Sequence, residues 1–507
     1  MNSGQARALL AQAGMALTVS ALIAGCGNNY RPVVTPITPS GPAPQITSYV
    51  VVVSTTGAST PGVATIIDYS GDAIMAQAPI GPGPNAFTID EIGSEGYTVN
   101  SDGTLTNFPI TTTLQAKNVI QSTLPFTAMP VNMMAPSTGL WAADLDGDVT
   151  DVFSGSPQTF KLAIPIVNTL PVSVFGPPTL TGQRDYVLSQ NVADSAPMTC
   201  NSSPRTAPIG SANPLEISTN TADPPIPVGK CPVYAVQSSD LRRFFVLNRG
   251  DDTITVINSQ NNTLDNQCPN GCVNQNGQTY YTHPVLPLST SAVTATGVTP
   301  PNGTAGMTAI AGPVYGEYNA ATQQLVVADY DGGTISLIDV SLDEYGNDSP
   351  TFGTTYTIHV GNTATPNPAS VTVLSDGSKA YTANQNDGTG NGTVTVVNLS
   401  THTAEKTLTV VGHPRTVAST QNSSYSKVYV ASPDSPYVTV LQSTPTVSDQ
   451  VDTTILVEGD VVDLRVTTQN GNSGNANFTS RVPGYGQPCN LPGASRTDTL
   501  TDCRAIQ

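Results

Sequence analysis

The sequence predicts an all-β protein, a β-propeller with eight blades favoured, and two observations carry this prediction. A hairpin phrase recurs four times between residues 243 and 441, as FFVLNRGDDTITVIN, LVVADYDGGTISLID, AYTANQNDGTGNGTVTVVN and VYVASPDSPYVTVLQ. The composition is rich in turn formers and poor in charge, with 44 Gly, 42 Pro and 11% charged residues. Each phrase joins two β-rich runs by a turn of Asn, Asp, Gly or Ser, which is typical of an antiparallel hairpin. A hairpin that recurs at long intervals indicates a repeat architecture.

Weaker copies of the hairpin extend the pattern towards the N-terminus, at 49–69, 96–110, 140–154 and 185–190. After several hairpins come a third strand and a Gly-x-x-Pro-like turn into a fourth, as in 226–240, 355–379 and 405–420. Four strands make one propeller blade. A single blade cannot bury both of its faces, whereas a closed ring of blades can.

The blade count and the ring closure follow from the two ends of this pattern. Eight hairpin starts predict eight blades; seven is the alternative if the Pro-rich segment 191–228 is an insertion. The hairpin at 49 has no strand before it, and the strand-like segment 461–469 follows the last hairpin. We therefore expect the C-terminal strand to join the first blade.

The best-preserved copies resemble a known repeat. Those residues are Val428-Tyr429-Val430-Ala431, Ile335-Ser336-Leu337-Ile338-Asp339, Gly412-His413-Pro414 and Leu374-Ser375-Asp376-Gly377-Ser378-Lys379. They resemble the YVTN-type β-propeller repeat family, which is related to YncE-like and surface-layer propellers. The resemblance implies the fold. It implies little about activity, because propellers include both binding modules and unrelated enzymes.

The N-terminus predicts export and lipid attachment. Arg7 precedes an apolar run of small residues, 13–25, which ends at Cys26 and is too short for a good membrane span. Ile23-Ala24-Gly25-Cys26 resembles the lipobox of bacterial lipoproteins; an ordinary signal peptide is the alternative. The expected parts are a signal peptide 1–25, lipidated Cys26 with a Pro-rich tether 26–46, the propeller 47–470 and a tail 471–507. Gly27 after the Cys implies the outer membrane, so we expect a cell-envelope protein whose anchor enters the lipid bilayer.

Cysteine usage fits an oxidising compartment. The chain has seven Cys, and six remain if Cys26 carries lipid. Proximity in the sequence suggests the disulfides Cys200–Cys231, Cys268–Cys272 and Cys489–Cys503. A metal cluster is the weaker alternative, because no second close Cys pair and no neighbouring His accompany them.

The net charge limits the partners. At −18, the chain lacks the density of Lys and Arg that binding to phosphates requires, so nucleic acid is not an expected partner. The partner classes that the charge leaves open are an envelope protein, a peptide and a glycan. Plain solubility of an exported protein explains the acidity equally well.

Polar residues in the hairpin and inter-blade turns are the candidate ligand site. In a propeller these turns ring one mouth of the central tunnel, and here they hold Asp102, Asp144, Asp146, Asp148, Arg249, Asp251, Asp252, Asp329, Asp331, Asp387, His413, Arg415 and Asp434. The structural alternative is that Asn and Asp simply favour turns. No cofactor is expected, with one exception: Asp144, Asp146 and Asp148 alternate on one turn and could bind Ca²⁺.

The sequence lacks a linear catalytic motif. It has four His, at 283, 359, 402 and 413, and only His413 lies in a turn that could face the tunnel. We therefore expect an envelope-anchored binding scaffold without catalysis. The alternatives are a periplasmic hydrolase or lactonase with a metal in the tunnel, and a structural cell-surface protein.

Overall fold

The computed structural model describes residues 48–467 apart from 91, 127, 129, 136–138, 145–148, 168–169, 177–184, 192–207, 274–276, 289–310, 345, 422–425 and 445–446. The chain divides into two compact units, Met1–Thr47 and Ser48–Gln507. Residues 1–47 and 468–507 lie outside the described residues. The described residues are almost entirely β, with a single 3-10 turn, η1 (Ala116–Asn118), and no α-helix among them.

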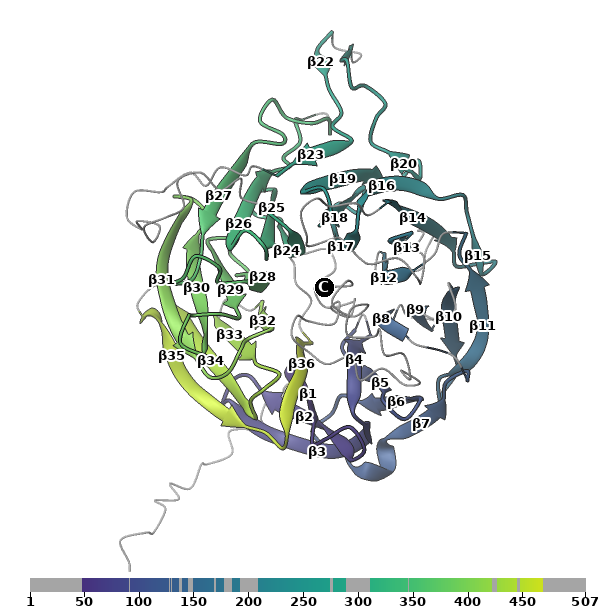
Figure 1. Ribbon diagram of the computed structural model, residues 1–507, viewed down its shortest axis with the longest axis vertical. Helices are drawn as coiled ribbons and strands as arrows, with labels where there is room; N and C mark the ends of the chain where they lie inside the picture. Colours follow the sequence, from purple (N-terminus) through teal and green to yellow (C-terminus); the bar gives the residue numbers. More distant parts are fainter. Residues whose placement is uncertain are drawn as a thin grey trace, which may run out of the picture. The chain divides into compact units, whose positions relative to one another are not determined.

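Eight sheets stand around a ring, each with one strand innermost and one outermost (Figure 1). From inside to outside, blade 1 is β36 (Asp460–Val466), β1 (Tyr49–Thr55), β2 (Pro61–Asp68) and β3 (Ala73–Pro82). Blade 2 is β4 (Pro84–Ile89), β5 (Glu95–Asn100), β6 (Thr104–Pro109) and β7 (Ile120–Thr123). Blade 3 is β8 (Pro130–Met134), β9 (Leu140–Asp144), β10 (Val149–Ser154) and β11 (Thr159–Pro165). Blade 4 is β12 (Pro171–Phe175), β13 (Asp185–Ser189) and β14 (Ile209–Glu216), with β15 (Thr221–Ala222) and β16 (Ile226–Lys230) outside.

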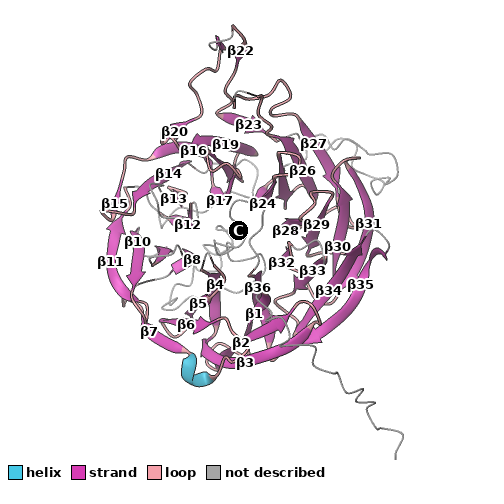
Figure 2. Cartoon of the chain, turned by 180° about the vertical axis from the view of Figure 1, so that it is seen from behind, coloured by secondary structure: helices cyan, strands magenta, loops and turns pink. Residues whose placement is uncertain are grey.

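The other four blades continue in the same order around the ring (Figure 2). Blade 5 is β17 (Pro232–Gln237), β18 (Arg243–Asn248) and β19 (Thr253–Asn258), with β20 (Thr263–Leu264) and β23 (Val285–Pro287) outside. Blade 6 is β24 (Pro313–Asn319), β25 (Gln324–Asp329), β26 (Thr334–Asp339) and β27 (Thr355–His359). Blade 7 is β28 (Pro368–Val373), β29 (Lys379–Asn384), β30 (Gly392–Asn398) and β31 (Thr403–Val410). Blade 8 is β32 (Thr416–Ser419), β33 (Lys427–Ala431), β34 (Tyr437–Thr444) and β35 (Val447–Leu456).

The predicted all-β class and the count of eight blades are confirmed. The seven-bladed alternative is wrong, because the described part of the segment 191–228 contributes β14, β15 and the start of β16 to the sheet of blade 4, beside β12 and β13. Strand β36 lies antiparallel beside β1, with Val50 opposite Val466 and Val52 opposite Leu464. Blade 1 thus combines residues from both ends of the described chain.

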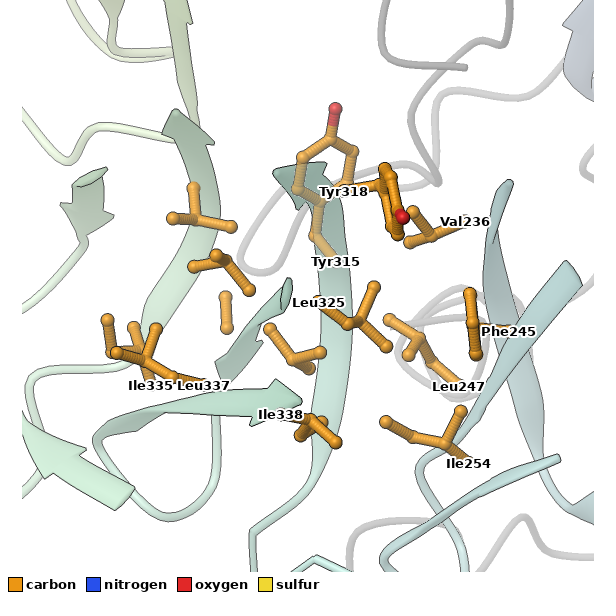
Figure 3. Packing of buried hydrophobic residues seen from close by; sticks show 14 of the residues in the cluster. Val236, Phe245, Leu247, Ile254, Tyr315, Tyr318, Leu325, Ile335, Leu337 and Ile338 are labelled. Carbon is orange, nitrogen blue, oxygen red and sulfur yellow. The ribbon is translucent and has the colours of Figure 1, made fainter. Parts of the chain in front are cut away.

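Apolar layers between neighbouring blades form the core. Successive residues of a strand point to opposite faces, and each blade face meets another blade, so the middle strands are buried on both sides. Every residue of β18, with sequence RFFVLN, is buried. Figure 3 shows one such layer, in which Phe245, Leu247 and Ile254 of blade 5 face Leu325 and Ile338 of blade 6.

A repeated set of polar contacts fixes the top of the hairpin in blades 2, 5 and 7. In blade 5 the amide Nδ2 of Asn248, the last residue of β18, donates to Thr253 Oγ1 (3.1 Å) and Thr255 Oγ1 (2.9 Å). Thr255 Oγ1 also accepts from the backbone N–H of Gly229 (3.2 Å). A Cβ on Gly229 would lie 2.5 Å from the Asn248 side chain, so the glycine of the Gly-x-x-Pro turn is required for close approach.

The proline of the same turn begins the innermost strand. Pro84, Pro130, Pro171, Pro232, Pro313 and Pro368 are each the first residue of such a strand. Proline has no N–H to donate, and the first position of an edge strand tolerates this loss. A proline thus marks where these six blades start, and the full Gly-x-x-Pro pattern precedes two of them, at Gly81 to Pro84 and at Gly229 to Pro232.

Polar latches join the second strand of one blade to the outer part of the next. Lys427 Nζ and Tyr429 Oη both donate to Asp72, at 2.5 Å each, and so link blade 8 to blade 1. Lys379 Nζ (2.6 Å) and Tyr381 Oη donate in the same way to Asp449, linking blade 7 to blade 8. The Lys-x-Tyr spacing places both donors on one side of the strand.

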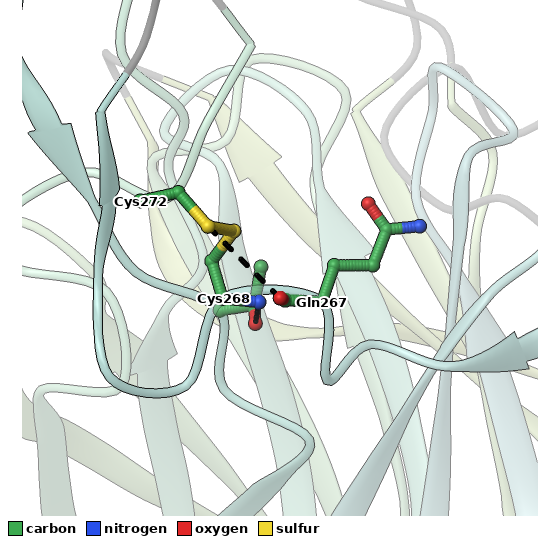
Figure 4. The surroundings of a disulfide bond; sticks show 4 residues. Gln267, Cys268 and Cys272 are labelled. Carbon is green, nitrogen blue, oxygen red and sulfur yellow. Dashed lines mark hydrogen bonds between the residues drawn. A yellow bond between two sulfur atoms is a disulfide. The ribbon is translucent and has the colours of Figure 1, made fainter.

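A long connection leaves blade 5 before blade 6 begins. It carries the small hairpin of β21 (Cys272–Val273) and β22 (Thr279–Tyr280) and the predicted disulfide Cys268–Cys272, which is confirmed (Figure 4). His283 Nδ1 lies 2.7 Å from Asp348 Oδ2 of blade 6, whose Oδ1 is 2.6 Å from Arg243 Nη2. This buried ion network attaches the connection to two blades.

Candidate functional site at the turn face

The candidate site lies at one end of the ring, which we call the turn face. Here the second strand of each blade turns into the third, and each outer strand passes to the innermost strand of the next blade. The two kinds of turn contact each other. Asp251 Oδ2 accepts from Lys230 N (3.0 Å), and Asp434 Oδ1 accepts from His413 N (2.8 Å). These contacts hold the rim of the turn face in a fixed shape.

A buried ion pair joins blades 5 and 6 at this face. Arg249 Nε and Nη2 donate to Asp331 Oδ2 (3.0 Å) and Oδ1 (2.7 Å), and the Arg249 side chain is 1% exposed. The guanidinium lies 5.6 Å from the centre of the Tyr330 ring. Two parallel hydrogen bonds of this kind are the strongest common form of ion pair. Arg249 therefore orders the rim, and both carboxylate oxygens of Asp331 are engaged by Arg249.

Of the remaining predicted carboxylates of blades 5 and 7, Asp251 and Asp387 accept bonds within their own turns, whereas Asp252 accepts one from the connection into blade 6. Asp252 Oδ1 accepts from Gly312 N (2.7 Å), and Asp251 Oδ1 accepts from Thr253 Oγ1 (2.8 Å). Asp387 Oδ1 accepts from Thr389 N (2.7 Å) and Asn391 N (3.1 Å). These bonds, with the backbone N–H of Thr389 foremost, lower the pKa of Asp387, so it is charged at neutral pH.

Blade 8 carries an exposed pair of side chains at this face. His413 Nδ1 lies 2.5 Å from Asp434 Oδ2, and the two side chains are 48% and 46% exposed. Partial burial would raise the pKa of Asp434, but the hydrogen bonds from His413 outweigh it and lower that pKa. The pKa of Asp460 is raised, first by burial and then by the charge of Asp434.

The other predicted site residues are spread over the ring. Asp102 is exposed and accepts from Thr104 N (3.1 Å) in its own turn. Arg415 is 5% exposed. Asp329 is fully buried rather than presented at the rim, with Oδ2 accepting from Thr334 Oγ1 (3.1 Å) and Ser336 Oγ (2.6 Å). Burial raises the pKa of Asp329 to about 7.

The expected Ca²⁺ ligands lie only partly in the described chain. Asp144 is 3% exposed at the end of β9, whereas Asp146 and Asp148 lie outside the described residues. Within the described ranges, no group of three or more His, Cys, Asp and Glu side chains could hold a metal ion. Calcium binding at Asp144, Asp146 and Asp148 stays a prediction.

Sequence reasoning missed three residues of this face. Tyr330 Oη donates to Gln385 Oε1 (3.0 Å) and so bridges blades 6 and 7, and Asp460 lies near Asp434. Tyr330 and Gln385 each directly follow the polar residue that ends the second strand of their blade. That position, one after the Asn or Asp of the repeat, is the signal that could have found them.

The surface of the turn face is acidic. Its described carboxylates are Asp102, Asp251, Asp252, Asp331, Asp387, Asp434, Glu458 and Asp460. Of the described Lys and Arg side chains on this face, Arg249 and Arg415 are buried, which leaves Lys230. Such a surface attracts cations and repels phosphates.

The remaining predictions concern cysteine and the membrane. Cys231 is disulfide-bonded, and its expected partner Cys200 lies outside the described residues, as do Cys26, Cys489 and Cys503. A search of the described residues found no helix with the length and apolar character to cross a membrane.

Comparison with known proteins identifies the fold and no family. No family model matches the chain, and no curated protein matches it. The structure of dihydro-heme d1 dehydrogenase NirN aligns with a TM-score of 0.51 at 12% identity, over 86% of this chain and 78% of that one. AztD from Citrobacter koseri aligns at 0.49 and 13%, over 83% and 97%, and the periplasmic gluconolactonase PpgL of Pseudomonas aeruginosa at 0.45 and 14%, over 83% and 99%. At such identities the likeness concerns architecture alone: the chain is an eight-bladed β-propeller.

Proposed function

We propose that the protein is a lipid-anchored scaffold of the cell envelope that binds a cationic partner at its turn face and has no catalytic activity of its own. The observation that supports this is the way the rim carboxylates are held. Asp251, Asp387 and Asp434 each accept a backbone N–H, which fixes the carboxylate in place. Side chains ordered before binding lose little entropy when a ligand arrives.

The ligand class follows from the charge of this face. A segment rich in Lys or Arg, from an envelope protein or a peptide, complements the acidic surface and would be steered towards it. Neutral sugars could also bond these oxygens, but they would gain nothing from the charge. We therefore favour a basic polypeptide segment, and salt dependence of binding distinguishes it from a glycan.

The test compares two faces at equal net charge. The first variant carries Asp251→Asn, Asp387→Asn and Asp434→Asn, since an Asn side-chain oxygen can still accept the turn hydrogen bonds. The control carries Asp240→Asn, Asp339→Asn and Asp376→Asn on the opposite face, where the same kind of turn bond occurs. Binding of a fluorescein-labelled oligolysine peptide is measured by anisotropy at two salt concentrations.

The expected result is a loss of affinity confined to the first variant. Three rim charges of the usual strength predict a weakening of roughly tenfold at low salt, which disappears at high salt. An equal loss in both variants would mean that oligolysine senses only the net charge. If the unaltered chain and both variants bind a neutral oligosaccharide mixture tightly and independently of salt, the ligand is a glycan rather than a basic segment.

The anchor has its own test. In cells fed an alkyne-tagged fatty acid, we expect the label on the unaltered chain and none on Cys26→Ser, which should leave the membrane fraction. Absence of label on the unaltered chain would remove the anchor from the proposal and leave the turn face untouched.

A further inference from the structure

The hairpin top of blade 8 departs from the polar pattern of the other blades. In blade 7 the amide of Asn384, at the end of the second strand, donates to two threonines of the third strand. The strand register gives blade 8 Ala431 in place of this amide, with Val438 and Val440 in place of the threonines. All three are buried. The turn of blade 8 is therefore fixed on an apolar base rather than by side-chain hydrogen bonds across the hairpin.

An aromatic side chain follows at the surface. Tyr437 precedes the first of these valines, whereas the equivalent residues of blades 5, 6 and 7 are Asp252, Gly333 and Gly392. Tyr437 lies opposite Leu456 of β35, and directly opposed residues of antiparallel strands project from the same face of a sheet. The two residues are 38% and 59% exposed. Blade 8 thus presents an apolar pair at a position where the other three blades have a small or charged residue.

This apolar pair faces blade 7. The chain neighbours of Tyr437 and Leu456 belong to the layer between blades 8 and 1, and successive residues of a strand point to opposite faces. The connection from blade 7 lies against the same turn, because the carbonyl of Val411 accepts from Ser432 Oγ (2.6 Å). Val411 is 45% exposed. We call Val411, Tyr437 and Leu456 the seam patch, since they lie at the turn-face end of the seam between blades 7 and 8.

The charged side chains that border the seam patch are acidic. Asp434 lies in the turn before Tyr437, and Glu458 and Asp460 follow β35. The residue after Asp460 donates its backbone N–H to the carbonyl of the residue after Asp434 (3.1 Å), which holds these two segments together. Glu458 and Asp460 are exposed, whereas the described Lys and Arg of blade 8 are 5% and 8% exposed. Charge complementarity therefore selects a partner that carries positive side chains next to an apolar one.

We propose that the cationic partner docks at the seam patch, through an apolar side chain flanked by Lys or Arg in a single polypeptide segment. This inference rests on the proposed binding function of the turn face, and it adds a position and a second recognition element. The carboxylates attract the segment, and the seam patch buries its apolar side chain. Tyrosine suits such a contact, because it offers a large area while losing little side-chain entropy on binding.

The test separates the apolar contact from the charge. Two fluorescein-labelled peptides of equal length and charge are compared: a Lys-rich peptide that carries Leu residues, and the same peptide with Gly in their place. The first variant carries Tyr437→Ser and Leu456→Thr, which leave every charge unaltered. The control carries Ile74→Thr and Met75→Thr in β3 of blade 1, where the side chains are 38% and 40% exposed. Affinities for the full-length proteins are measured by anisotropy.

The expected result is a preference for the Leu peptide that depends on the seam patch. The unaltered chain and the control should bind the Leu peptide roughly tenfold more tightly than the Gly peptide, because burial of apolar surface adds to the attraction between charges. The first variant should bind both peptides equally, at the affinity that the unaltered chain has for the Gly peptide. Equal affinity of the unaltered chain for the two peptides would overturn the proposal, and so would a preference that persists in the first variant.

The Gly peptide tests the proposed function separately. If Asp251→Asn with Asp387→Asn and Asp434→Asn leaves its affinity unchanged, the cationic site itself is wrong, whatever the Leu peptide does.

Hydrogen exchange on the unaltered chain locates the contact without any substitution, and so decides even if the first variant does not fold. Saturation with the Leu peptide should increase protection over 434–441 and 451–461 more than over 248–258, the equivalent hairpin of blade 5. Equal increases in both blades would contradict docking at the seam patch.

Discussion

At the scale of single residues, the Asn–Thr–Gly contact explains why Gly81 and Gly229 stand at the turns into blades 2 and 5. Gly229 has no side chain, so its Cα can lie close to the Asn248 amide. Gly81 lies close to Asn100 for the same reason. Neither glycine has a positive φ, so the constraint is space rather than backbone conformation. The glycine, the amide and the threonine hydroxyl form one unit.

Replacing Gly229 by Ala should therefore destabilise the protein. The new Cβ would press on Asn248 at 2.5 Å, and relief would break its bonds to the threonines. We expect a loss of about 1 to 3 kcal/mol, measured by chemical denaturation. Gly71→Ala is the matched control, because its nearest atom would lie 3.5 Å away, and it should be almost neutral. Equal effects of the two changes would show that the close approach does not matter.

The sequence predicts which residues lie in turns, but it does not predict whether each of their side chains points into the blade or out to solvent. The run Asp329, Asp331 gives two acids on one hairpin, and nothing in the letters says that one is buried. Strand register decides it: Asp329 pairs with Thr334 inside the blade, and Asp331 lies two residues further, in the turn. An Asp at a turn can stabilise the turn or bind a ligand. Its hydrogen-bond donors in the structure are needed to tell the two roles apart.

At the scale of elements, strands were predictable and latches were not. Alternating Val, Ile and Thr with regular turn residues predicts each hairpin, and a proline after the inter-blade turn predicts where the next blade begins in six cases. The partners of Lys427 and Tyr429, by contrast, lie more than 350 residues away in the sequence. Such contacts depend on the ring being closed, which no local pattern encodes.

The latch between blades 8 and 1 should be measurable as a coupling energy. Tyr429→Phe and Asp72→Asn each remove one partner, and the double variant completes a cycle. We expect a coupling of about 1 to 2 kcal/mol in urea denaturation. Additive effects would mean that the two side chains act independently. Tyr381→Phe with Asp449→Asn, in the equivalent latch between blades 7 and 8, should give a similar value.

Strand β36 should contribute far more than any latch. Its residues Val461, Leu464 and Val466 belong to the apolar layer between blades 8 and 1, and without it β1 becomes an uncovered innermost edge. A chain that ends after Gly459 should melt at a sharply lower temperature in a calorimeter. A chain that ends after Asn470 keeps the strand and should melt close to the unaltered protein. Equal melting of the two truncated chains would contradict a stabilising role for β36.

At the scale of the whole molecule, the topology decides which charged side chains meet at each end of the ring, and both ends carry carboxylates, such as Asp251 at the turn face and Asp376 at the opposite face. The described Lys and Arg residues outside the turn face, such as Lys117, Lys161 and Arg242, lie at the opposite end or the outer strands. Composition gave the net charge of −18 but not this distribution, because the distribution depends on which turns meet at which end. The whole-molecule fold was thus predictable from repetition, whereas the location of an interaction surface required the topology.

The most direct test of a binding turn face is photo-crosslinking in living cells. The crosslinking residue p-benzoylphenylalanine is placed at Ser101 or Thr389 on the turn face, and at Asp240 or Asp376 on the opposite face. Our account predicts discrete crosslinked adducts from the turn face only, weakened by the Asp251, Asp387 and Asp434 changes to Asn. Adducts from the opposite face alone, or none from the turn face in cells that hold the protein in their envelope, would contradict it.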